Sequence, residues 1–127
     1  MSFATDIYSL MIADTALNTA VPGGIYFQNL PDNPVLTQKY IIYTYSLTDS
    51  IDHLAKNNEL DIFNLRITIL APDTNSLMTI VDTLRAYLDN LETSKFRDIK
   101  SQNSETETEG DREQYSYTIN YKLTYQT

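Results

Sequence analysis

The chain has 127 residues, of which 42% are hydrophobic and 20% charged, a net charge of −8 and no cysteine. This composition is typical of one globular domain, over residues 1–127, and excludes disulfides, thiolate metal sites and cysteine nucleophiles. The acidic balance argues against wrapping nucleic acid, which requires basic residues that displace counterions, although DNA could still pass without adhering. The N-terminus lacks the pattern of a secretory signal, and no apolar run approaches the ~20 residues of a membrane span. We therefore expect a soluble protein that is not exported by the standard route.

The first expected element is a short helix over residues 2–16. Phe3, Ile7, Leu10 and Met11 recur on one side of it, at helical spacing. The proline and glycines of residues 21–24 end this helix, and a short strand is expected at residues 25–27. A turn with a proline at each end follows at residues 31–34.

Residues 39–47 form a predicted strand rich in tyrosine, isoleucine and threonine. Apolar or aromatic groups occupy both of its faces, which is typical of a central strand or of one whose second face meets a partner. The polar stretch that follows, residues 48–59, is expected to hold a turn of helix near Ile51, His53 and Leu54.

Residues 60–91 predict a strand, a turn and a helix around which the fold is organised. Phe63, Leu65, Ile67 and Ile69 alternate with polar residues, which indicates a strand with one buried face. Pro72 ends the strand, and Asp73 or Thr74 is the expected N-cap. The helix that follows has an apolar stripe, expected to pack on that strand with Leu84 facing Ile67. The stripe consists of Leu77, Ile80, Val81, Leu84, Tyr87, Leu88 and Leu91.

The last part of the chain predicts an extended hairpin. Residues 96–103 form a weak strand, and residues 104–113 contain five acids against one arginine, a local charge of −4. Residues 115–125 alternate tyrosine, isoleucine or leucine with polar residues, and so form a clear strand. The hairpin tip is expected near Glu109 and Gly110. The expected fold class is α+β, a mainly antiparallel sheet of four or five strands with two helices packed on one face.

The sequence offers little chemistry. His53 is the only histidine, and a metal pair with Asp49 would need several further ligands, so a solvated loop histidine is the expected reading. Nucleophilic triads lack their residues, the carboxylates lie in segments expected to be exposed, and no phosphate-binding loop is present. We expect no enzymatic activity, no metal and no cofactor.

Tyrosines and acids are the candidate interface residues. Seven of the ten tyrosines lie on two predicted strands, where they could pack across the sheet or face a neighbouring subunit. The acidic run could be a solvated tip, a repulsive channel lining or a docking surface for a basic partner. Its alternating acids are expected to share a face with Tyr115 and Tyr117. The candidates are Tyr43, Tyr45, Glu105, Glu107, Glu109, Asp111, Tyr115 and Tyr117.

The order of these elements resembles the small tail-completion, or tail-terminator, proteins of long-tailed (siphovirus-like) bacteriophages over nearly the whole length. The resemblance rests on degenerate apolar and aromatic patterns in a fixed order, and this chain departs from it in its longer acidic segment. The matching segments are Gly24-Ile25-Tyr26, Tyr40-Ile41-Ile42-Tyr43, Leu65-Arg66-Ile67-Thr68-Ile69-Leu70-Ala71, Leu84-Arg85-Ala86-Tyr87-Leu88 and the tyrosine-rich last strand.

The resemblance implies a homo-hexameric ring at the head-proximal end of the tail tube, which ends tube polymerisation and joins the tail to the head connector. The implied partners are other copies of the chain, the tail tube protein and the head–tail connector protein, with no membrane and with DNA only passing through the lumen. The implied location is the virion tail, after synthesis in the bacterial host cytoplasm. Two alternatives stay open: a head-completion protein one layer above, and a small acidic monomeric binding or inhibitor module.

Overall fold

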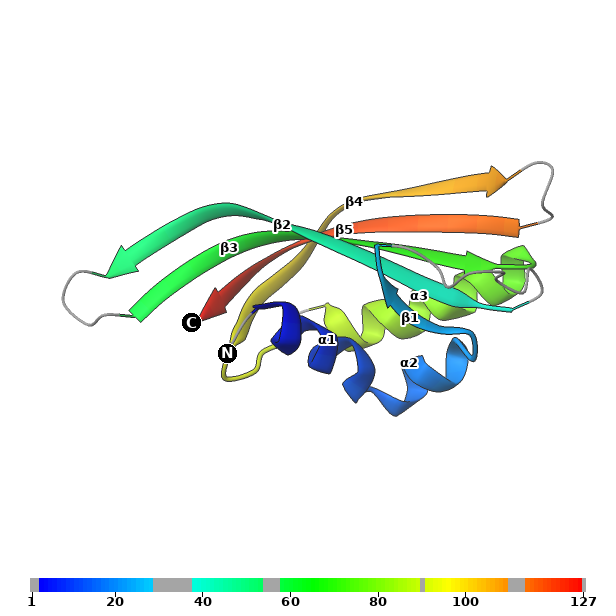
Figure 1. Ribbon diagram of the computed structural model, residues 1–127. Coiled ribbons are helices and arrows are strands. Elements are labelled where there is room, and N and C mark those ends of the chain that lie inside the picture. Colours follow the sequence, from blue (N-terminus) through cyan, green and yellow to red (C-terminus); the bar gives the residue numbers. More distant parts are fainter. Residues whose placement is uncertain (1–2, 29–37, 54–57, 90, 110–113, 127) are drawn as a thin grey trace.

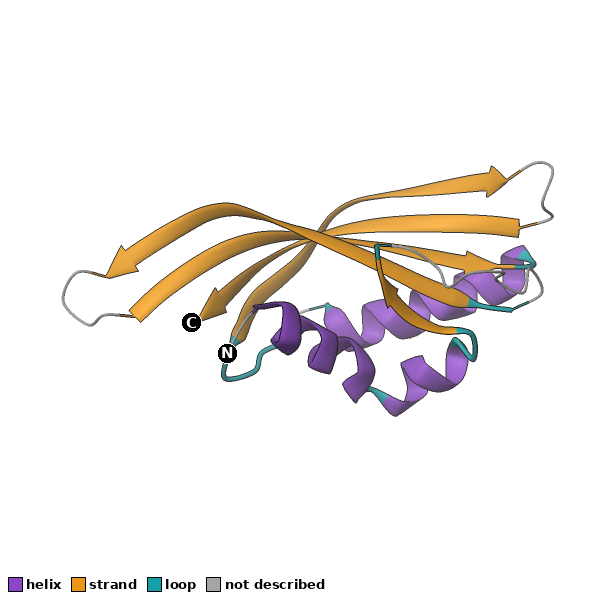
Figure 2. Ribbon diagram, viewed as in Figure 1, coloured by secondary structure: helices purple, strands orange, loops and turns teal. Residues whose placement is uncertain are grey.

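A computed structural model describes residues 3–28, 38–53, 58–89, 91–109 and 114–126. The elements in chain order are α1 (Phe3–Ala13), α2 (Thr15–Ala20), β1 (Gly24–Phe27), β2 (Tyr40–His53), β3 (Asn58–Ala71), α3 (Thr74–Leu88), β4 (Phe96–Glu109) and β5 (Gln114–Gln126). The strands form one sheet in the order β1-β2-β3-β5-β4, in which only β1 and β2 are parallel neighbours. The helices lie together on one face of this sheet (Figures 1 and 2). The predicted α+β class with a mainly antiparallel sheet is confirmed.

The described residues contain three helices where two were expected, because the first predicted helix is divided at Asp14. The Asp14 backbone is extended, and its side chain accepts a hydrogen bond of 3.1 Å from the Leu17 backbone N–H. Asn18 donates side-chain hydrogen bonds of 2.8 Å to the carbonyl oxygens of Ile12 and Asp14. Asp14 therefore caps a new helix, while Asn18 satisfies carbonyl groups at the end of the preceding one.

The core lies between the helices and the inner face of the sheet, by which we mean the helix-covered face. The predicted period of two is confirmed in β3 and β5, where the odd-numbered positions from Phe63 to Ile69 and from Ile119 to Tyr125 are buried. The predicted α3 stripe is buried at its aliphatic positions through Leu88, with Tyr87 and Leu91 half-buried against the core. Asp73 is the N-cap, accepting from the Ser76 backbone N–H at 2.7 Å. Ile67 and Leu84 are both fully buried in this core.

The hairpin of β2 and β3 is longer than predicted. Backbone pairing continues through Ile51 with Leu60 and through His53 with Asn58, so the expected helical turn near Ile51 and His53 is wrong. The backbone groups that a helical turn would pair with one another are paired instead with β3, which begins at Asn58. Leu54 lies outside the described residues.

The hairpin of β4 and β5 is extended, as predicted, and β4 continues through the acidic segment to Glu109. Its register shifts between Arg97 and Lys100 and between Ser101 and Asn103, which marks two irregularities in the first half of the strand. The expected tip at Gly110 lies outside the described residues. The two hairpins project from the helix-covered centre at opposite ends of the sheet (Figure 1).

The turn into β1 needs both of its glycines. Gly24 has a φ of +111°, a conformation that side-chain-bearing residues rarely adopt. A Cβ atom on Gly23 would lie 2.5 Å from the Lys39 carbonyl oxygen and from the Tyr40 ring. This close approach places β1 beside β2.

Candidate interface surfaces

The described residues hold no group of three or more His, Cys, Asp or Glu side chains placed to bind a metal ion. None of the helices in the described ranges has the length and apolarity to cross a membrane. His53 is the last residue of β2. The candidate functional features of this molecule are its surfaces.

Tyr43 and Tyr45 belong to an aromatic cluster between the sheet and α1. Tyr43 is only 2% exposed, and burial raises the pKa of its hydroxyl. Tyr45 is half-buried, with its ring centroid 4.8 Å from that of Phe3 and 5.1 Å from that of Phe27. In the single chain, part of the Tyr45 side chain is thus accessible, whereas the Tyr43 side chain is enclosed.

Tyr115 and Tyr117 are half-buried and pack against the core on the inner face. Further along β5, Tyr121 and Tyr125 are fully buried and their hydroxyl groups are satisfied internally. Tyr121 donates a hydrogen bond to Asp89 at 3.0 Å, and Tyr125 donates one to Asp6. Most of the tyrosine side-chain surface on β5 is therefore buried within the single chain.

Asp6 is the buried carboxylate of the molecule's described part. It accepts a hydrogen bond from Tyr125 and forms an ion pair with Lys95, whose Nζ lies 3.2 Å from the Asp6 carboxylate oxygen. The Tyr125 hydrogen bond, followed by the Lys95 contact, lowers the pKa of Asp6 despite its burial. Burial and the Asp6 hydrogen bond raise the pKa of Tyr125 to about 12. Asp6, Lys95 and Tyr125 together attach α1 to β5 and to the segment just before β4.

The acidic positions of β4 do not share a face with Tyr115 and Tyr117, so that prediction is wrong. Glu105 is in register with Thr118, Glu107 with Ser116 and Glu109 with Gln114. Cross-strand partners share a face, and the tyrosines stand opposite Thr106 and Thr108 instead. The error arises because alternation along the sequence does not continue across a hairpin turn: in the observed register, odd-numbered positions of the acidic half of β4 pair with even-numbered positions of β5. Asp111 lies outside the described residues.

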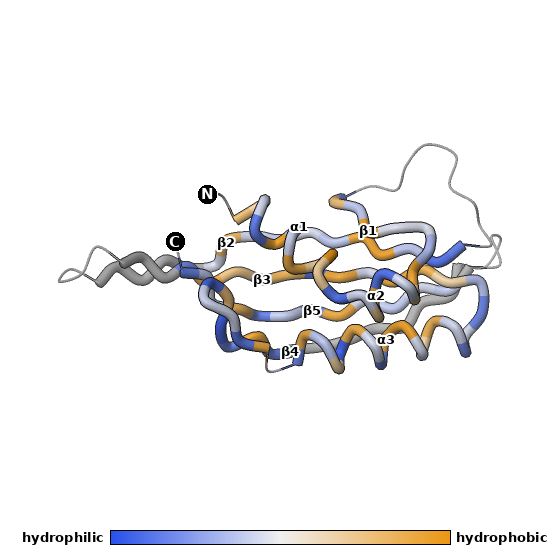
Figure 3. The backbone as a smooth tube through the Cα atoms, turned by 90° about the horizontal axis from the view of Figure 1, so that it is seen from below, coloured by the Kyte–Doolittle hydropathy of each residue, from blue (hydrophilic) through white to orange (hydrophobic). Residues whose placement is uncertain are grey.

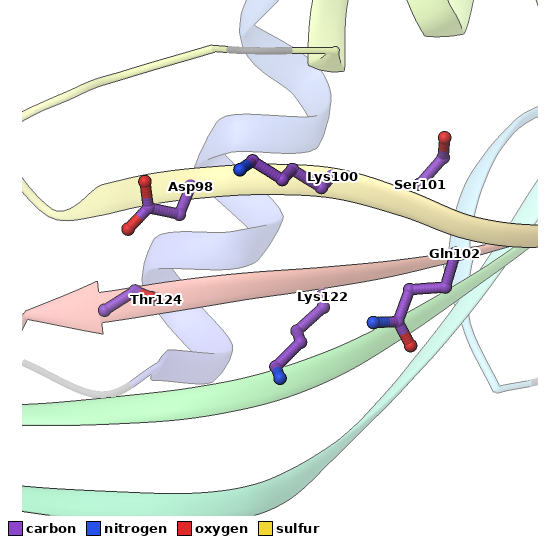
Figure 4. A pocket seen from close by; sticks show the side chains of 6 residues that line it. All are labelled: Asp98, Lys100, Ser101, Gln102, Lys122 and Thr124. Carbon is purple, nitrogen blue, oxygen red and sulfur yellow. The ribbon is translucent and has the colours of Figure 1, made fainter.

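Basic side chains gather on the outer face, the sheet face away from the helices. Lys100 of β4 is directly opposite Lys122 of β5, an arrangement of like charges that destabilises a sheet unless an anion or water screens it. Both lysines line an open pocket of about 580 Å³ (Figure 4). Its lining residues are Asp98, Lys100, Ser101, Gln102, Lys122 and Thr124.

Exposed apolar groups gather where β1 and β2 form one edge of the sheet. Phe27 is 43% exposed and Leu47 56%, and the half-buried Tyr45 lies between them on the same face. Tyr8 and Ile12, one helical turn apart on α1, are also exposed. Figure 3 shows α1 running along this side of the sheet, and the Tyr8 hydroxyl interacts electrostatically with Tyr43. We call Tyr8, Ile12, Phe27, Tyr45 and Leu47 the edge patch.

Sequence reasoning identified only Tyr45 within the edge patch. The available signal was the apolar character of both faces of residues 39–47, which was read as a central strand or a partner contact. Within the described residues, β2 is paired on both sides over Tyr40–Tyr43. β1 has the short length expected from the sequence, but its parallel pairing with the start of β2, which leaves the rest of β2 as an edge, is a tertiary contact that the sequence does not show.

Neither a family model nor a curated protein matches the sequence. The fold does match solved structures, among them a chain from a structure described as the virion of a native gene transfer agent (GTA) particle. The TM-score is 0.72 at 12% sequence identity, and the match covers 99% of this chain and 100% of that one. At this identity the comparison establishes a shared fold.

Proposed function

We propose that this chain is a structural component of a phage-like virion. The observation that carries the proposal is the fold shared end to end with a chain of the gene transfer agent virion, in which neither chain has a domain left over. The order of elements in the sequence led independently to virion proteins of long-tailed phages. Two lines of inference, one from residue patterns and one from backbone geometry, thus favour the same class of protein.

Within the virion, we assign the chain to a homo-hexameric ring at the head-proximal end of the tail tube. A ring needs two different surfaces on each subunit, because a head-to-tail contact closes only when the patch on one copy fits another patch on the next. The molecule offers such a pair: the uncharged edge patch on β1 and β2, and the acidic half of β4 at the other edge of the sheet. The tail tube protein and the head–tail connector protein are the partners above and below.

The proposed role is architectural, without catalysis. The buried Asp6 is held in its ionised form by Tyr125 and Lys95, and the Ser76 hydroxyl, which donates to Asp73 at 3.0 Å, belongs to the N-cap of α3. The acidic segment, present six times in a hexamer, would repel DNA in a lumen or dock on a basic neighbour.

Deleting the gene from the phage that encodes this chain tests the assignment. Because a tail terminator stops tube growth, electron microscopy of the lysate should show tubes longer than wild-type tails and heads without tails. Tails of normal length that fail to join heads would assign the chain to the head-completion layer. Normal particles lacking this chain would contradict the virion role and favour the monomeric acidic module, whose solution mass should be that of one chain.

A further inference from the structure

We infer that the open edge of β2 pairs with the acidic half of β4 in a second copy of this chain. The inference rests on the proposed function, since it supplies the contact between neighbouring ring subunits. It joins residues 44–47 of one subunit to residues 104–109 of the next and places the edge patch at the centre of the contact.

The open edge of β2 is long. β1 pairs with Tyr40–Tyr43 and ends there, with one further hydrogen bond from Gln28 to the Tyr43 carbonyl at 3.0 Å. From Thr44 to His53, β2 has β3 on one side and no described strand on the other. The outward N–H and C=O groups of such a stretch form a ready template for another strand.

Residues 44–47 lack the features that protect sheet edges. They contain no charge and no proline, and their pairing with β3 is regular; the register of β2 shifts only after them, between Leu47 and Asp49. The first half of β4, at the opposite edge, is protected by two register shifts, a positive φ at Asp98, and the charges of Arg97 and Lys100. Natural proteins place bulges and charges on edges that must stay unpaired, so the contrast marks β2 as the edge that receives a partner.

Apolar side chains flank the open edge and favour a protein partner. Phe27 and Leu47 lie on either side of Tyr45, and Tyr8 and Ile12 extend the surface onto α1. Four of the five large hydrophobic side chains found exposed in the described part of the chain belong to this patch; the fifth, Met78, is on α3. Clustered exposed aromatic and aliphatic groups are typical of interface centres.

The second half of β4 is the complementary strand on the same chain. After its register shifts, β4 pairs regularly with β5 from Ser104 to Glu109, so its outer edge is straight. Strand directions in the sheet make β2 and β4 antiparallel, and a neighbouring copy continuing the sheet would therefore form an ordinary antiparallel pair. One chain cannot make this contact by itself, because β2 and β4 are separated by β3 and β5.

Charge selects between the possible pairings of edges. Two β4 strands side by side would bring together Glu105, Glu107 and Glu109 from both copies, which is repulsive. A β4 strand beside residues 44–47 of β2 meets no like charge. The pairing that avoids repulsion and uses the regularly paired part of each edge is head-to-tail, the kind of contact that generates rings.

Disulfide trapping tests the inference directly, since the native chain contains no cysteine. Ser46→Cys is mixed in turn with Ser104→Cys, Thr106→Cys and Thr108→Cys, as purified chains and co-assembled in tails, and oxidised. Cα atoms of paired antiparallel strands lie about 4.5–5.5 Å apart, within reach of a disulfide. A cross-link between position 46 and one of the β4 positions is the expected result. Cross-links of Ser46→Cys only to itself would show a two-fold contact, and no cross-link at all would show no contact; either result overturns the inference.

A charge substitution with a matched control gives a second test. Leu47→Glu should weaken self-association at least about tenfold by sedimentation, because it places a carboxylate in an apolar contact. Met78→Glu alters a residue as exposed as Phe27 on a different surface, and should change association by less than about twofold. Equal effects of the two substitutions would contradict the assigned surface. Tails that carry a ring without the cross-link would refute this contact and leave the proposed function standing, whereas absence of the chain from tails would refute the proposed function.

Discussion

Asp6 shows how a single residue joins segments that are far apart in the sequence. It lies on the first turns of α1, and its partners are Lys95, just before β4, and Tyr125, near the end of β5. Phe3, also on α1, packs with its ring 5.0 Å from that of Tyr125. The N-terminal helix is therefore fixed to β5 by a hydrogen bond and a ring contact from Tyr125, and to the segment before β4 by an ion pair from Lys95.

The Asp6 contact predicts a specific loss of stability in acid. Because its pKa is lowered in the folded state, Asp6 contributes stability that is fully present above its unfolded pKa of about 4 and is lost as the pH falls through the folded value. Between about pH 5 and pH 2, the free energy of unfolding should fall more steeply for the native chain than for Asp6→Asn. Urea denaturation at a series of pH values measures this slope. Asp82→Asn, at an exposed position of α3, is the control, and a native slope no steeper than that of Asp6→Asn would refute the role.

At the scale of the element, β3 and α3 behave as the central unit that their periodicities predict. Their alternating and helical patterns are strong because each element buries one face against the same core. Ile67→Ala or Leu84→Ala should each lower the free energy of unfolding by about 2–5 kcal/mol, the usual cost of truncating a buried aliphatic side chain. Arg66→Ala, at the exposed position next to Ile67, should cost far less. Chemical denaturation would contradict the assigned faces if Arg66→Ala gave the largest loss.

The division between α1 and α2 depends on one cap. Replacing Asp14 with alanine should destabilise the protein by about 0.5–2 kcal/mol, because the Leu17 N–H loses its acceptor. Asp14→Asn retains an acceptor oxygen and should recover most of the loss. Thermal unfolding of both variants checks this. Equal stability of Asp14→Ala and the native chain would show that α2 is held by packing of Leu17 alone.

Prediction from sequence succeeded where one face of an element meets the core. The strands around Ile67 and Ile119 and the helix through Leu84 have clear periods because half of their positions meet the core. Residues 51–53 extend β2 beyond the helix-covered centre, so their composition resembles that of a loop, and only pairing with β3 makes them a strand. The edge patch was missed for a different reason: the sequence predicts the short strand at residues 25–27 but does not show that this strand pairs with the start of β2 and leaves the rest of β2 as an edge.

At the scale of the molecule, the acidic half of β4 does not present its glutamates on the same sheet face as the tyrosines, contrary to the expectation from the sequence. The register places Glu105 and Glu107 opposite Thr118 and Ser116, while Tyr115 and Tyr117 pack on the helix-covered core. A docking role for these acids must therefore rest on charge, without tyrosine anchors. Six subunits would bring eighteen of these glutamates together, three from each chain, and their mutual repulsion requires water or a basic neighbour.

Replacing Glu105, Glu107 and Glu109 together with glutamine tests that requirement. The fold should remain intact by circular dichroism and tails should have normal length, because glutamine has nearly the shape of glutamate and the β5 residues in register with these positions are polar. Fewer joined particles should appear in a lytic complementation assay if the acids dock on a basic neighbour. Wild-type yields of joined particles would rule out docking, and delayed DNA ejection from those particles would favour a channel lining instead.

The position and copy number of the chain in assembled tails test the central claim most directly. Cryo-electron microscopy of tails from the encoding phage should show six copies of this fold in one ring at the head-proximal end of the tube, with the edge patch of each copy against the next. A single copy, a two-fold dimer, or tails without this chain would contradict the account.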